Sequence, residues 1–118
     1  MSVTFLAIGD ELLRGNTHES NGHHLAVTLE RQGVALLEAR HVSDARTDVV
    51  RAVRALAARA PLLLISGGLG PTDDDQTRAA LAEAAGTTLQ LDMDVLDDLT
   101  SRYAERGRPF TETNRRQA

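Results

Sequence analysis

The 118-residue sequence contains no cysteine and no lysine. The absence of cysteine excludes disulfides, zinc–thiolate sites and a cysteine nucleophile. The absence of lysine excludes a Walker-type phosphate loop and Schiff-base chemistry, because both depend on the lysine amine. All thirteen positive charges are therefore arginines, and any catalysis must use other residue types.

Long apolar runs and a basic excess are also missing. No run approaches the roughly 20 apolar residues that span a bilayer, and the N-terminus lacks a signal-peptide pattern. We therefore expect a cytoplasmic protein with no membrane partner. The net charge of -4 argues against a nucleic-acid partner. The length predicts a single domain over residues 1–118 with one core.

The rest of the sequence alternates between strand and helix patterns. Strands are predicted over 3–8, 34–42, 61–66 and, more weakly, 87–91. Helices are predicted over 18–32, 44–60, 73–85 and 92–107, with Gly33 and Gly86 as C-terminal caps. The apolar run at 61–66 is typical of a strand covered on both faces. This order predicts an α/β fold, a three-layer αβα sandwich with a mostly parallel sheet.

Acidic loops follow the first three predicted strands, at 9–17, 43–48 and 67–75. In parallel sheets, ligands bind beyond the carboxyl ends of the strands. Asp10 and Glu11 follow the first strand, Asp44 follows the second, and Asp75 lies in the loop after the third. We therefore expect these carboxylates to gather at one edge of the sheet.

The third loop reads SGGLGPTDDDQT. Gly67, Gly68 and Gly70 permit positive φ and a close approach of backbone N–H groups to a ligand. Thr72 is a candidate N-cap with Asp75 three residues later, and the helix start would attract an anion. The loop is not a dinucleotide fingerprint, because Asp73 stands where the third glycine belongs.

Two explanations account for the three consecutive aspartates, Asp73 to Asp75. Acidic residues in the first turn stabilise a helix by about 0.3–1 kcal/mol each. Alternatively, one or more aspartates hold a divalent cation that in turn binds phosphate. The spacing leaves both open.

The histidines and the C-terminal arginines are interpreted as surface residues. His18, His23 and His24 include no i,i+4 pair, and adjacent helical residues point about 100° apart. Arg106, Arg108, Arg115 and Arg116 are interpreted as a solvated basic tail rather than as a phosphate clamp.

Four segments carry a family resemblance: GDELLRGNTHESNGHHLAVTLERQG, HVSDARTDVVRAVRAL, SGGLGPTDDDQTRAALAEAAG and TETNRRQA. Together they resemble the N-terminal domain of the competence/damage-inducible CinA family, within the wider MoaB/MogA molybdopterin-binding-like fold. The resemblance implies metal-dependent cleavage of ADP-ribose to AMP and ribose 5-phosphate. The alternative is a module that binds molybdopterin or a nucleotide without hydrolysis.

The resemblance also implies roles for individual residues. Asp44 and Asp75 would be catalytic and would hold the metal. The nucleotide or cofactor would contact a larger set: Gly9, Asp10, Glu11, Asn21, Gly67, Gly68, Gly70, Thr72 and Asp74.

The implied cofactor is Mg²⁺ or a similar divalent ion, with K⁺ as a further candidate. The implied partners are ADP-ribose or a pterin phosphate and further copies of the chain. The family's domain continues past the last residue of this sequence, so the resemblance implies a domain incomplete at its C-terminus. Nicotinamide mononucleotide deamidation, ascribed to a separate domain of the family, is not assigned here.

Overall fold

A parallel sheet of three strands forms the centre of the molecule. The structure, a computed structural model, describes residues 1–118. Its strands are β1 (Ser2–Ile8), β2 (Ala35–Val42) and β3 (Leu62–Ser66), in the order β2-β1-β3. Both pairings are parallel, so the carboxyl ends of all three strands lie at the same edge of the sheet.

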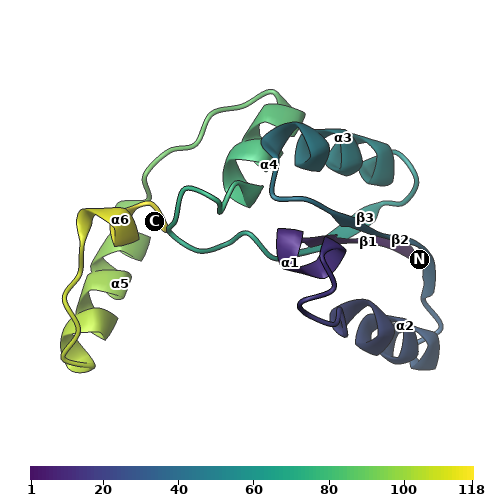
Figure 1. Cartoon of the computed structure of the whole chain (residues 1–118), viewed down its shortest axis with the longest axis horizontal. Helices are drawn as coiled ribbons and strands as arrows, with labels where there is room; N and C mark the ends of the chain where they lie inside the picture. The colour runs from purple at the N-terminus through teal and green to yellow at the C-terminus, as the bar shows by residue number, and fades with distance from the viewer.

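Helices cover both faces of this sheet (Figure 1). On one side lies α2 (Asn21–Arg31), and on the other lie α3 (Arg46–Ala57) and α4 (Thr77–Ala85), which packs on α3. The short α1 (Asp10–Leu13) directly follows β1. The predicted αβα sandwich with a parallel sheet is confirmed.

The core lies between the sheet and α3. Leu6 and Ile8 of β1 pack with Val49, Val53 and Leu56 of α3, and all five side chains are buried. The apolar residues of α3 recur at helical spacing, which places them on one face and the arginines on the other. Burial of this face therefore fixes the helix on the sheet.

The last part of the chain forms a C-terminal lobe, defined here as residues 92–118, which extends away from the sheet (Figure 1). It contains α5 (Met93–Glu105) and α6 (Glu112–Arg115). The rings of Tyr103 and Phe110 meet edge to face at 5.4 Å, and Asn114 Nδ2 donates to the Tyr103 hydroxyl at 3.0 Å. The lobe is therefore held together mainly by its own contacts. Neither its helices nor any other in the structure combine the length and apolar character needed to cross a bilayer.

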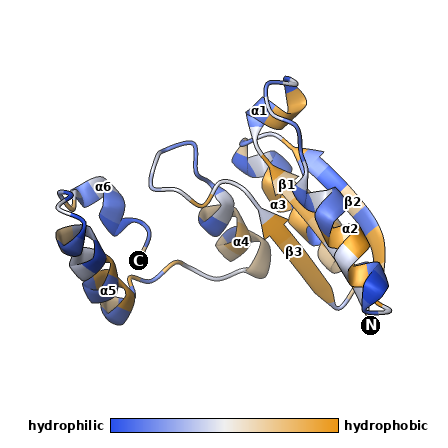
Figure 2. Cartoon of the chain, turned by 90° about the horizontal axis from the view of Figure 1, so that it is seen from below, coloured by the Kyte–Doolittle hydropathy of each residue, from blue (hydrophilic) through white to orange (hydrophobic).

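One strand prediction was wrong, and the strand predicted over 61–66 is confirmed but is less covered than expected. Residues 87–91 form no strand, and Leu89 and Leu91 in this connection are 60% and 41% exposed. The segment leaves the sheet, so it has no neighbouring strand with which to pair. The strand predicted over 61–66 is an edge strand with Leu62 40% exposed, although it is apolar along its length (Figure 2). It pairs only with β1 and is not covered on both faces.

The assigned core is tested with Leu56→Ala. Leu56 is fully buried, so the truncation should lower the free energy of unfolding by about 2–5 kcal/mol through lost contacts and a cavity. Urea denaturation measures this change. Leu13→Ala is the control, because Leu13 is 56% exposed and should shift stability by roughly 0.5 kcal/mol or less. Equal losses in the two variants would contradict the assigned core.

Candidate functional site

The loops after β1 and β2 are joined by a reciprocal pair of aspartates. The Asp10 N–H donates to Asp44 Oδ2 at 2.9 Å, and the Asp44 N–H donates to Asp10 Oδ1 at 3.0 Å. A backbone bond from Gly9 N to Val42 O at 3.1 Å lies beside them. The other carboxylate oxygen of Asp10, Oδ2, accepts a hydrogen bond from Arg14 Nη2 at 3.0 Å. The structure thus brings Asp10 and Asp44 together at the strand ends, as predicted.

The glycine loop, defined here as residues 67–76, begins by crossing the end of β1. Gly67 has φ +96°, and a Cβ atom at this position would overlap the carbonyl oxygen of Ile8. Gly68 has φ +62°, and its Cβ would overlap Thr77 Oγ1. Both glycines are therefore required by contacts within the protein, as well as by the backbone conformation.

Buried Thr77 fastens the start of α4 to these glycines. Its Oγ1 donates to Gly67 O at 2.8 Å, and its N–H donates to Gly68 O at 3.3 Å. The backbone N–H groups of Gly67, Gly68 and Leu69, in contrast, donate to no acceptor in the protein. Three consecutive unpaired N–H groups at a strand end can bind an anion.

Glu11 and Asn21 lie on either side of the strand ends. The Glu11 carboxylate folds over Gly9, where a Cβ atom would lie 2.5 Å from Glu11 Oε1. Asn21 Nδ2 donates to Ser66 Oγ at 2.8 Å, which links the start of α2 to the end of β3. Ser66 was missed in the sequence, although its place directly before Gly67 is a signal that could have identified it.

The aspartates of the glycine loop lie outside α4, which corrects the predicted helix start. α4 begins at Thr77 and has no acidic residue in its first turn. Stabilisation of a helix dipole therefore does not explain Asp73, Asp74 and Asp75. The reason is that the hydrogen bonds of Thr77 fix the first helical turn and leave the aspartates in the preceding turn.

Thr72 and Asp75 form the predicted side-chain pair, but in this turn rather than on a helix. Thr72 donates from Oγ1 at 2.6 Å and from its N–H at 3.0 Å, both to Asp75 Oδ2. Hydrogen bonding from the Thr72 side chain, followed by backbone hydrogen bonds from Gly70 and Thr72, holds the pKa of Asp75 below its ordinary value of 3.8. Asp75 therefore remains ionised at neutral pH and closes the turn.

Asp44 and Asp75 belong to two separate hydrogen-bonded groups. No hydrogen bond or ion pair joins the Asp10–Asp44 pair to the Thr72–Asp75 turn, and no three His, Asp or Glu side chains gather as a metal-binding cluster. One oxygen of Asp75 and one of Asp44 have no hydrogen-bond donor in these pairs. The shared metal site thus stays a prediction.

A cleft of about 370 Å³ lies on the other side of the glycine loop, between this loop, α4 and the C-terminal lobe. Its polar walls include Arg78, Arg115 and Arg116, and its apolar walls include Leu89 and Leu91. Of the predicted site residues, Gly70, Thr72 and Asp75 line the cleft, whereas Gly9, Asp10, Glu11, Asn21, Asp44, Gly67, Gly68 and Asp74 do not. The predicted set therefore divides between the sheet edge and this cleft, except for Asp74, which lies in the turn before α4.

Comparison with known proteins places the chain in a family. Residues 4–114 match the family model described as "Probable molybdopterin binding domain". CinA-like proteins from Myxococcus xanthus and from Geobacter sp. strain M21 are 43% and 42% identical over 107 and 119 residues. These matches cover 91% and 100% of this chain but 25% and 28% of the relatives, so the chain spans about a quarter of their length.

Solved structures agree with this similarity. The crystal structure of the protein CinA from Thermoplasma acidophilum, described as having unknown function, matches with a TM-score of 0.88 and 27% identity. The match covers 98% of this chain and 67% of that one. The molybdopterin biosynthesis enzyme MoaB from Thermus thermophilus matches with a TM-score of 0.63 and 24% identity over 70% of this chain and 53% of that one, which shows a shared fold.

The crossing of the glycine loop over β1 is tested with Gly67→Ala. Gly15→Ala is the matched control, because Gly15 has φ +74° but nothing lies within 4 Å of its Cβ position. The control substitution should lower the free energy of unfolding by about 1–2 kcal/mol, from backbone strain alone. Gly67→Ala should lower the free energy of unfolding by roughly 1–3 kcal/mol more than the control does, because its Cβ overlaps the carbonyl oxygen of Ile8. Thermal and urea unfolding measure both, and equal costs would contradict the crossing.

The role of Asp75 in the turn is tested by the pH dependence of stability. A lowered pKa in the folded state stabilises the protein above pH 3.8, and this contribution is lost as the pH falls through the lowered pKa. Asp75→Asn should therefore be less stable than the natural sequence at pH 7, and the difference should narrow toward pH 3. Asp74→Asn, whose side chain makes no hydrogen bond, should show no such pH-dependent gap. Urea unfolding at several pH values measures it.

Proposed function

The chain belongs to the family of probable molybdopterin-binding domains and is CinA-like over its length, and on this premise we propose that it hydrolyses the pyrophosphate of ADP-ribose to AMP and ribose 5-phosphate. One observation supports this most directly. The unpaired N–H groups of Gly67 to Leu69 lie at the same sheet edge as the Asp10–Asp44 pair. A diphosphate and a cation can be bound together at such an edge.

The unpaired N–H groups supply the diphosphate site. They follow β3, next to the end of β1, which is the point where the strand order reverses from β2 on one side to β3 on the other. Ligands of open parallel sheets bind at this position. Backbone N–H groups fixed by the Gly67 and Thr77 contacts can bind phosphate oxygens without rearranging.

The carboxylates fit a cation of the Mg²⁺ type only if the substrate completes its coordination. Mg²⁺ commonly takes one or two carboxylates together with substrate phosphates and water. Asp44 and Asp75 each have one oxygen outside their hydrogen-bonded pairs, which suits this mode. When bound, the ion would neutralise charge on the phosphate oxygens. In this proposal the one remaining oxygen of Asp44 binds the ion, while Asp10 holds Asp44 in place.

A second candidate is a module that binds a nucleotide or a pterin phosphate without hydrolysis. The unpaired N–H groups of Gly67 to Leu69 favour this candidate, because they can bind a phosphate without a metal. The two candidates share one site and differ in whether the bound phosphate ester is cleaved.

The hydrolase proposal is tested by AMP release from ADP-ribose with Mg²⁺. Asp44→Asn keeps an oxygen for the Asp10 N–H but removes the charge, so it should lower the rate roughly 100-fold or more. Asp75→Asn should also lower it, and EDTA should abolish release. Asp97→Asn, which alters an exposed acid on α5, should release AMP at the unaltered rate.

Calorimetry with ADP-ribose under the same conditions separates the candidates. Binding without AMP release would support the binding module. Release that persists in Asp44→Asn at the unaltered rate would contradict the role given to this aspartate.

A further inference from the structure

We propose that the cleft between the glycine loop and the C-terminal lobe is a second site, which binds the phosphate monoester of a nucleotide or sugar phosphate through Arg115 and Arg116. This site shares Asp75 with the proposed cation site, but it lies apart from the Asp10–Asp44 pair and needs no metal. The inference goes beyond the proposed hydrolysis and does not depend on it. It revises the interpretation of these arginines as a solvated tail.

Three guanidinium groups reach the cleft from two different parts of the chain. Arg78 comes from α4, whereas Arg115 and Arg116 come from the end of the C-terminal lobe. Arg78 donates to Leu69 O at 2.8 Å and to Gly70 O at 3.1 Å, so it shapes the glycine loop. The other two arginines line the same cleft.

Arg115 has donors available for a ligand. Its nearest carboxylate is that of Glu112 at 3.8 Å, and no hydrogen bond is made between them. The Arg115 side chain is 45% exposed. Arginine binds phosphate in a bidentate geometry through parallel N–H groups. Arg115 therefore has an ion-pair partner in Glu112, but its hydrogen-bond donors are unoccupied and can bind an anion in the cleft.

Arg116 forms an ion pair with the carboxylate of Asp73, which takes the position that the phosphate of a ligand would occupy. Its Nη1 contacts Asp73 Oδ1, and both side chains are largely exposed. Exposed ion pairs contribute little to stability. A phosphate dianion carries more charge than one carboxylate, so it can displace Asp73 from Arg116.

The apolar wall selects an organic phosphate over the bare ion. Leu89 and Leu91 line the cleft and remain 60% and 41% exposed. These side chains, together with Pro71, which also lines the cleft, offer an apolar surface to a base or a sugar. Small-molecule sites commonly combine such a surface with a few placed charges.

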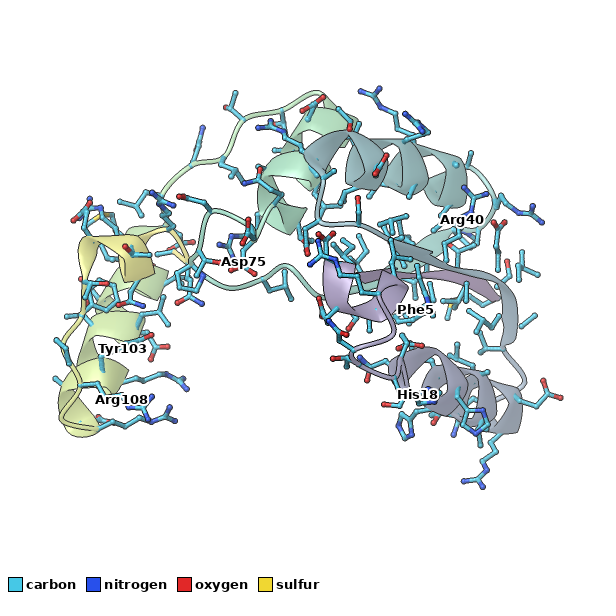
Figure 3. All side chains as sticks on the ribbon, viewed as in Figure 1. Phe5, His18, Arg40, Asp75, Tyr103 and Arg108 are labelled. Carbon is cyan, nitrogen blue, oxygen red and sulfur yellow. The ribbon has the colours of Figure 1, made fainter.

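The test measures AMP binding by calorimetry with EDTA present. Arg115→Ala should weaken AMP binding about tenfold, because it removes a charge-assisted contact to phosphate. Asp73→Asn should tighten binding severalfold, because it releases Arg116. Arg108→Ala is the matched control, since Arg108 lies at the end of the lobe away from the loop that carries Asp75 (Figure 3). It should bind AMP unchanged.

Further ligands identify what the cleft recognises. Ribose 5-phosphate that binds as well as AMP points to a sugar-phosphate site, and weaker binding points to a nucleotide site. Both results require that adenosine, which lacks phosphate, binds much more weakly than AMP. Thermal unfolding of Arg115→Ala confirms that the variant is folded, as expected for an exposed side chain.

Three results would overturn the proposal: no AMP binding, adenosine that binds as tightly as AMP, or affinities unaffected by both Arg115→Ala and Asp73→Asn. The EDTA separates this test from that of the hydrolase. AMP binding that responds to these variants stands even if ADP-ribose is never cleaved. Conversely, cleavage that depends on Asp44 stands even if the cleft binds nothing.

Discussion

The close passage of Gly67 over the Ile8 carbonyl is the contact on which the arrangement of the strand ends depends. A side chain at this position would overlap the end of β1, so only glycine lets the chain leave β3 in this direction. The Thr77 hydrogen bonds to Gly67 and Gly68 then fix where α4 begins. One backbone crossing thus sets both the direction of the glycine loop and the position of its unpaired N–H groups.

The carboxylates near this crossing first satisfy the backbone of their own loops. Asp10 and Asp44 accept each other's N–H groups, and Asp75 accepts from Thr72. The second oxygen of each carboxylate takes no part in these bonds, and that of Asp10 pairs with the exposed Arg14. The same side chain can therefore hold a loop and offer an oxygen to a ligand, because the two oxygens of a carboxylate can serve different partners.

Much of the fold could be predicted because it follows from local periodicity. The apolar spacing of α3, the β-rich segments and the positive-φ glycines after α2 and α4 all agree with the structure. The order of acidic loops correctly predicted that Asp10 and Asp44 meet. These features depend on residues that are near in sequence or on the parallel order of strands.

The remaining features depend on long-range contacts that periodicity does not contain. The start of α4 is set by Thr77 and its hydrogen bonds to the glycines. The predicted helix, which began at Asp73, therefore started four residues too early. Residues 87–91 have an alternating pattern but no strand beside them. The tail arginines are exposed, as interpreted, but the contact of Arg116 with Asp73 was missed because nothing in their spacing shows that the lobe returns to the glycine loop.

The contact between the C-terminal lobe and the rest of the chain is sensitive to dissolved salt, because it depends on an exposed ion pair. The Arg116–Asp73 ion pair is the one hydrogen-bonded side-chain contact between residues 92–118 and the sheet-bearing part of the chain. Dissolved ions screen such exposed charges over about 8–10 Å at physiological concentrations. A rise in ionic strength should therefore weaken this one ion pair between the lobe and the glycine loop.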